Sequence, residues 1–118
     1  MNDNKRIASL NDALRKSIGD GNINQTDGNN RIILTSGVYA LPFRQAVLKQ
    51  VRDFEIDYDF NENNDPFQTH DMGSFHVNNI KFFWKIDYYD NSMKHGSEDP
   101  SNAEITTRVL TIMKAEEY

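Results

Sequence analysis

The sequence contains no cysteine, which excludes a disulfide framework, a zinc site built on thiolates and a cysteine nucleophile. It has no run of about 18 apolar residues, and the polar opening Met1–Arg6 lacks the apolar segment of an export signal. We therefore expect a cytoplasmic protein that does not cross a membrane.

Common catalytic and nucleotide-binding motifs are also missing. The sequence has no G-x-S-x-G turn for a serine nucleophile, no phosphate-binding loop and no G-x-G-x-x-G fingerprint. These absences argue against a serine hydrolase and against nucleotide hydrolysis. No cofactor is expected.

Charge is distributed unevenly along the 118 residues. Residues 1–52 carry eight Lys and Arg against four acids, and residues 53–118 carry five against fourteen, so balances of +4 and −9 make up the net charge of −5. Non-specific affinity for nucleic acid comes mostly from Lys and Arg side chains that neutralise phosphates. Because the C-terminal half is strongly acidic, we expect no direct binding of DNA or RNA. A protein partner with a basic surface is favoured.

The length is that of a single domain, residues 1–118, with one core. Apolar spacing predicts one helix that stops near Gly19 and a second helix that follows Pro42. Residues 31–35 form a short β-branched run typical of a buried strand. The helical positions are Ile7, Leu10, Leu14 and Ile18 in the first helix, and Phe43, Val47, Val51 and Phe54 in the second.

Residues 75–90 alternate apolar and polar side chains on both sides of the pair Asn78-Asn79, which predicts a β-hairpin. We expect an α+β fold in which a small antiparallel sheet with this central hairpin packs against two or three helices. The core-facing residues are Phe75, Val77, Ile80, Phe82, Trp84 and Ile86. The opposite face holds His76, Lys81, Phe83, Lys85, Asp87 and Tyr89.

Residues 101–115 are ambiguous between helix and strand. Ser101 and Glu104 match a capping box, and the apolar residues after them fall on helical spacing, so a helix is the first expectation. The β-branched Thr106, Thr107 and Val109 leave a strand open for residues 104–115.

The segment 53–65 alternates acidic residues with Ile56, Tyr58 and Phe60 and contains no Lys or Arg. A solvated acidic loop is the simplest interpretation. The functional interpretation is a surface that binds a partner, to which Tyr88 and Tyr89 are added. Its acidic members are Asp53, Glu55, Asp57, Asp59, Glu62 and Asp65.

The most enzyme-like group is His70 with Asp71 and the nearby His76. Two histidines and a carboxylate can bind a divalent metal, and a His beside an Asp can act as a general base. Asp87 and Asp90 would complete such a site. A turn stabilised by the His-Asp pair explains the same residues, and their spacing matches no known metal motif, so no metal site is predicted.

Several strings along the chain share the pattern of one protein family. They are Arg6-Ile7-Ala8, Leu10-Asn11-Asp12, Leu34-Thr35 with Gly37-Val38, Asn64-Asp65-Pro66-Phe67, His70-Asp71-Met72-Gly73, the run 83–90 (F-W-K-I-D-Y-Y-D), the run 107–113 (T-R-V-L-T-I-M) and Ala115-Glu116-Glu117-Tyr118. With these strings the chain resembles a family of short bacterial proteins known only as a domain of unknown function. The resemblance covers nearly the whole chain, except that the Asn-rich segment 20–30 and the acidic segment 55–62 depart from the family pattern. It implies a compact free-standing protein found in bacterial genomes, including plasmids and other mobile elements, and it brings no catalytic residues.

Three functions remain open from the sequence. The first is a non-enzymatic acidic protein, phage- or plasmid-encoded, that binds and inhibits a nucleic-acid-handling defence effector of the CRISPR or restriction type. The second is a small metal-dependent or hydrolytic enzyme centred on His70 and Asp71. The third is an interaction domain that forms a homodimer through Phe83, Tyr88 and Tyr89.

Overall fold

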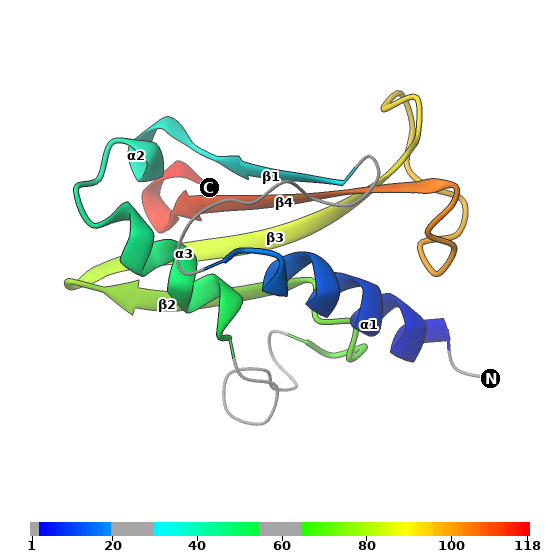
Figure 1. Ribbon diagram of the computed structural model, residues 1–118, viewed down its shortest axis with the longest axis horizontal. Coiled ribbons are helices and arrows are strands. Elements are labelled where there is room, and N and C mark those ends of the chain that lie inside the picture. The colour runs from blue at the N-terminus through cyan, green and yellow to red at the C-terminus, as the bar shows by residue number, and fades with distance from the viewer. Residues whose placement is uncertain (1–2, 20–29, 55–64) are drawn as a thin grey trace.

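The computed structural model describes residues 3–19, 30–54 and 65–118. They form three α-helices, a four-stranded sheet and a short 3₁₀ helix (Figure 1). The helices are α1 (Asp3–Lys16), α2 (Ser36–Tyr39) and α3 (Arg44–Arg52), and η1 spans Ala115–Glu117. The strands are β1 (Arg31–Leu34), β2 (Met72–Val77), β3 (Ile80–Asp90) and β4 (Thr106–Lys114), in the order β1-β4-β3-β2. The α+β class predicted from the sequence is confirmed.

The predicted hairpin is formed by β2 and β3, which pair antiparallel around Asn78 and Asn79. Both asparagines have positive φ, 50° and 65°, which is the backbone geometry of a tight two-residue hairpin turn. Phe82, Trp84 and Ile86 are buried in the core, as their alternation predicts. The register places Met72 opposite Lys85 and Val77 opposite Ile80.

The helix expected over 101–115 is wrong, since Thr106–Lys114 is strand β4. This strand lies between β1 and β3 and is buried on both faces, so its sequence loses the alternation that marks a strand with one wet face. The expected capping box is a turn instead. The Ser101 hydroxyl donates to Asp99, and the Glu104 N–H donates to the side chain of Asn102.

The sheet is mixed where an antiparallel one was expected. β1 runs parallel to β4, with Arg31 opposite Val109 and Leu34 opposite Ile112, whereas β3 runs antiparallel to β4. The one-turn helix α2, which was not predicted, separates β1 from α3. Glu117 of η1 receives hydrogen bonds at the start of α2, from the Thr35 hydroxyl and the Gly37 N–H.

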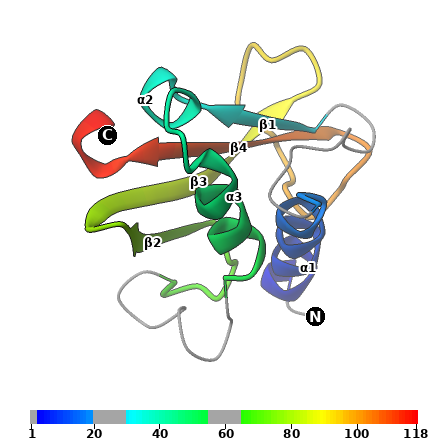
Figure 2. The ribbon, with the colours of Figure 1, turned by 60° about the vertical axis from the view of Figure 1, so that its left-hand side comes forward.

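Helices α1 and α3 cover one face of the sheet, and the core lies between them and the strands (Figure 2). Both were predicted, with α1 ending at Lys16 and α3 starting at Arg44, within a few residues of the expected bounds. The core cluster combines Leu14 and Ile18, four residues from α3 and its end, and the inward residues of β3 and β4, among them Trp84 and Leu110.

The opposite face of the sheet has no helix over it in the described part of the chain (Figure 2). We call it the open face. Alternation along the strands places Lys85, Asp87 and Tyr89 of β3 on it, opposite Thr111, Val109 and Thr107 of β4. Within residues 3–19, 30–54 and 65–118, no helix has the length and apolar character needed to cross a membrane.

Candidate functional site

A buried arginine on α1 closes the C-terminal end of α3. The side chain of Arg15 is 1% exposed, and its Nη1 donates hydrogen bonds to the backbone carbonyls of Val51, Arg52 and Phe54, at 3.2, 2.9 and 3.1 Å. The last carbonyls of a helix have no partner within the helix, and a cation there also favours the helix dipole. Arg15 therefore fixes the chain up to Phe54.

Asp12, one turn before Arg15, joins that arginine to His70. Its Oδ1 lies 3.0 Å from Nη2 of Arg15 and 3.1 Å from Nδ1 of His70, and its Oδ2 lies 3.2 Å from the same ring nitrogen. The exposed fractions are 16% for Asp12 and 12% for His70. One carboxylate thus holds two cationic or potentially cationic side chains in a partly buried position.

Asp65 binds His70 from the other side. Its Oδ1 accepts the backbone N–H of His70 at 3.0 Å, and its Oδ2 lies 3.6 Å from Nε2 of the ring. Asp65 itself is buried. The turn between them includes positive φ values at Gln68 and His70, 57° and 56°, a conformation that non-glycine residues adopt only where surrounding contacts hold it. The chain from Asp65 to His70 is therefore fixed against α1.

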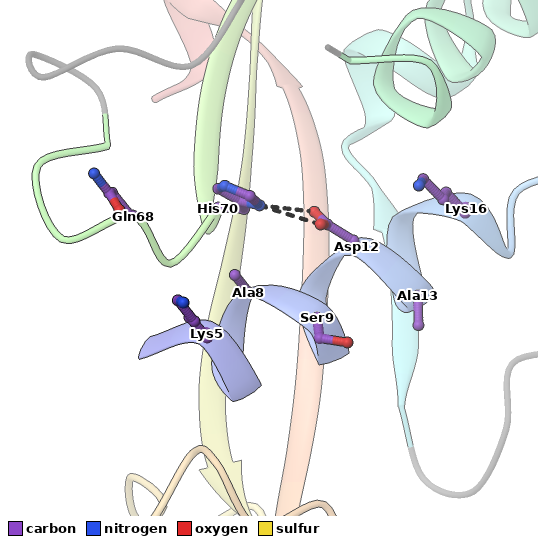
Figure 3. Close-up of a pocket in the computed structure, with 8 residues that line it drawn as sticks. All are labelled: Lys5, Ala8, Ser9, Asp12, Ala13, Lys16, Gln68 and His70. Carbon is purple, nitrogen blue, oxygen red and sulfur yellow. Dashed lines mark hydrogen bonds and ion pairs between the residues drawn. The ribbon is translucent and has the colours of Figure 1, made fainter. Parts of the chain in front are cut away.

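A hollow of about 540 Å³ runs beside this pair, between α1 and the turn at residues 66–70. Figure 3 shows the His70 ring directed at the Asp12 carboxylate, with Lys5 and Lys16 at the two ends of the same helix face. Ala8 and Ala13 leave space between the charged residues.

A second chain of hydrogen bonds starts at Asn11, which precedes Asp12 in α1. The side chain of Asn11 is fully buried. Its amide nitrogen donates to the Thr69 carbonyl at 2.9 Å and to the Tyr88 hydroxyl at 2.8 Å, and its amide oxygen accepts from Nε of Arg108 at 2.9 Å. The Tyr88 hydroxyl in turn donates to Asp71 at 3.2 Å. The chain therefore runs from a buried cation to a carboxylate through two neutral groups.

Burial shifts the pKa values of Tyr88 and Arg108 in this second chain. It raises the pKa of Tyr88, and the nearby Asp71 adds to the rise against the opposing hydrogen bond from Asn11. Burial lowers the pKa of Arg108, which also donates to the Pro100 carbonyl. Tyr88 therefore remains a neutral donor and acceptor at physiological pH.

The chemistry available to His70 is limited by its two carboxylate neighbours. A catalytic imidazole needs one ring nitrogen oriented by an acceptor and the other directed at substrate. Here Nδ1 faces Asp12 and Nε2 faces Asp65. The described residues contain no group of three or more His, Cys, Asp or Glu arranged to hold a metal ion. The two carboxylates thus hold the His70 ring in place from both sides.

The structure describes two of the six acidic residues predicted to bind a partner. Asp53 is exposed at the end of α3, where a hydrogen bond from Arg52 lowers its pKa. Asp65 points inward to His70. Glu55, Asp57, Asp59 and Glu62 lie outside the described residues.

The two tyrosines added to that surface lie on different faces of the sheet. Tyr88 is on the helix-covered face, bound to Asn11, and Tyr89 is on the open face.

The residues of the predicted enzymatic group are spread over the sheet. Asp71 accepts from Tyr88 on the helix-covered face. His76 and Asp87 lie on the open face, where Asp87 pairs with Lys85 at 2.9 Å. Asp90 binds Ser92 and the Lys94 N–H in the loop after β3, and these bonds lower its pKa. His70 has Asp12 and Asp65 as its close carboxylates instead.

Sequence reasoning missed Asn11, Asp12, Arg15 and Arg108. The first three lie between the apolar positions of α1, so the spacing assigned them to the solvent-exposed side of that helix. The one available signal was that Asn11, Asp12 and Arg15 lie within a single helical turn, so that one face of α1 carries both an acceptor and donors.

A family model described as "Protein of unknown function (DUF3768)" matches residues 34–117. This range begins at Leu34, the last residue of β1, and contains α2, α3, the whole hairpin, β4 and η1. No curated protein and no solved structure matches the chain.

Proposed function

Since the chain belongs to the DUF3768 family of proteins of unknown function, we propose a role from its own charges and contacts: it is a non-enzymatic protein that binds a basic protein surface through the acidic segment 55–64. The observation that carries this proposal is that α1 holds the chain on both sides of that segment. Arg15 binds the backbone as far as Phe54, and Asp12 binds His70 beside Asp65.

The composition of the chain supports the choice of segment. Residues 20–29 and 55–64 contain six acids and no Lys or Arg, so the remaining residues, with twelve acids and thirteen Lys and Arg, carry a balance of +1. The negative character of the protein thus belongs to these two segments. Only 55–64 is bounded by the Arg15 and His70 contacts.

Fixed ends favour binding because they reduce the conformational freedom that a segment loses in a complex. Acids at short intervals provide a negative potential that attracts a groove suited to nucleic acid, where carboxylates replace phosphates. The partner class is therefore a nucleic-acid-handling protein in the cytoplasm. Its concrete form is a CRISPR or restriction effector that the protein inhibits.

The test compares three tagged proteins in a capture from bacterial lysate, quantified by mass spectrometry. The first is the wild type, and the second replaces Glu55, Asp57, Asp59 and Glu62 by the corresponding amides. The third is a control that removes four exposed acids elsewhere, Asp3, Glu98, Glu104 and Glu116, and so has the same net charge.

A nucleic-acid-handling protein retained by the wild type and the control, lost from the segment variant and released at high salt is the expected result. Equal retention by the wild type and the segment variant at low salt would refute the proposal. Equal loss from the segment variant and the control would also refute it, since net charge would then explain the binding.

A further inference from the structure

The open face of the sheet has a hollow of about 590 Å³ along β4, lined by apolar and aromatic side chains together with Lys85, Asp87, Glu117 and two threonines. Its floor includes Val109 and Met113, which are 5% and 4% exposed although they lie outside the main core cluster. Ile33 of β1, 46% exposed, borders the hollow. Exposed apolar side chains that gather within a rim of polar residues are typical of interaction sites.

The two ends of the hollow are aromatic or contain methionine. At one end Tyr118, 78% exposed, packs against Phe83 with ring centroids 5.4 Å apart. At the other end lie Tyr89 and Met93. Aromatic side chains and methionine are enriched in protein interfaces relative to the rest of the protein surface.

Lys85 and Asp87 occupy the middle of this face. They are two residues apart on β3, point the same way, and form an ion pair at 2.9 Å with each side chain 39% exposed. Their register partners on β4 are Thr111 and Val109. A cation and an anion that lie side by side on one face can also pair with the same two residues of a second copy in reversed order.

We propose that the open face packs against the open face of a second copy of the chain, related by a two-fold axis that runs between the two sheets and across the strands at Ile86. Two-fold symmetry makes an interface self-complementary. Each group must therefore meet a suitable partner at the position that lies equally far from the axis on the other side of it. Lys85 and Asp87 lie one residue on either side of Ile86. Lys85 of each copy therefore meets Asp87 of the other.

The same axis pairs the ends of the hollow. Phe83 and Tyr89 lie three residues on either side of Ile86 on β3. The pair Phe83 and Tyr118 of one copy is thus placed over Tyr89 and Met93 of the other, aromatic against aromatic and sulfur. Face-to-face packing of two sheets about 10 Å apart is a common arrangement for such surfaces.

Charge reversal tests this interface. The mass in solution is measured by light scattering and sedimentation over concentrations from about 1 µM to 1 mM, a range that covers weak and moderate self-association. The wild type is expected to reach twice the 13.7 kDa chain mass. Lys85→Asp and Asp87→Lys each place like charges against one another, and each is expected to raise the dimer dissociation constant about tenfold or more.

The double reversal, Lys85→Asp with Asp87→Lys, restores opposite charges across the axis and is expected to restore the dimer. Lys49→Asp, on the outer face of α3, changes the net charge as Lys85→Asp does and leaves the dimer intact. Circular dichroism verifies the fold of each variant. A wild type that stays at 13.7 kDa at every concentration would overturn the proposal, as would a dimer that none of the open-face variants weakens.

Discussion

The amide of Asn11 joins Nε of Arg108 to the hydroxyl of Tyr88, residues that lie 97 and 77 positions away along the chain. The bonds are 2.9 and 2.8 Å long, and Asn11 and Arg108 are almost completely buried. One side chain of α1 therefore links the central strands β3 and β4 to the turn that precedes β2.

Replacing Asn11 by Ala removes the acceptor of a buried guanidinium and the donor to Tyr88. The Nε–H of Arg108 then has no acceptor in a buried position, which is costly for a charged group, so we expect a loss of about 3 kcal/mol in the free energy of unfolding, measured with urea. Gln50→Ala, an exposed change on α3, is the control and is expected to stay within about 0.5 kcal/mol of the wild type.

Tyr88→Phe tests whether the pair acts as a unit. Alone it is expected to cost about 1–2 kcal/mol, and combined with Asn11→Ala it should add much less than that. Simple additivity of the two losses would show that the hydrogen-bond chain is not coupled.

Gly73 lies where β2 passes under the core aromatics. A Cβ at this position would lie 2.5 Å from Cζ of Phe54 and 2.6 Å from Nε1 of Trp84. Gly73→Ala is therefore expected to destabilise the protein by about 2–3 kcal/mol in thermal or urea unfolding. Gly96→Ala, whose Cβ would come no closer than 3.7 Å to the Tyr88 carbonyl, is the control that should leave stability nearly unchanged.

The hairpin could be predicted because its signal is local. Asn78 and Asn79 tolerate positive φ, and β3 has one buried and one open face, so its residues alternate. Strand β4 was mistaken for a helix because burial on both faces removes that alternation, and Val109 and Ile112 then fit helical spacing by chance.

The site could not be predicted in the same way. Asn11, Asp12 and Arg15 look like the wet side of an amphipathic helix until the fold brings them against partners 36 to 97 residues away. Sequence spacing describes contacts within an element and says little about such distant pairs.

The hairpin turn at Asn78 and Asn79 gives a further stability test. Asn79→Gly removes the side chain from a residue with φ of 65° and is expected to be neutral or stabilising, whereas Asn79→Val should cost about 1–2 kcal/mol. Equal stability of the two variants in urea would argue against the positive-φ turn.

Glu117 makes the stability depend on pH. Burial alone would raise its pKa, but hydrogen bonds from the Thr35 hydroxyl and from the N–H groups of Lys114 and Gly37 outweigh this and hold the pKa below its ordinary value of 4.5. A lowered folded-state pKa gives stability that is present above pH 4.5 and lost as pH falls through the folded-state value.

The variant Glu117→Gln tests this linkage. The difference in unfolding free energy between wild type and variant should be largest at neutral pH and shrink as pH falls below 4.5. A difference that does not change between pH 7 and the acid range would contradict the assignment.

Asp12 connects the two ends of the acidic segment, because this one carboxylate contacts both Arg15, which binds the end of α3, and His70, which binds beside Asp65. The most direct measurement is amide hydrogen exchange of the wild type and of Asp12→Asn, with Asp3→Asn on the same helix as the control. We expect Asp12→Asn to speed exchange about tenfold or more both at 51–54 and at 65–71, with β3 and β4 unchanged. Faster exchange at only one of these two segments, or at neither, would contradict the claim that α1 holds the chain on both sides of the acidic segment.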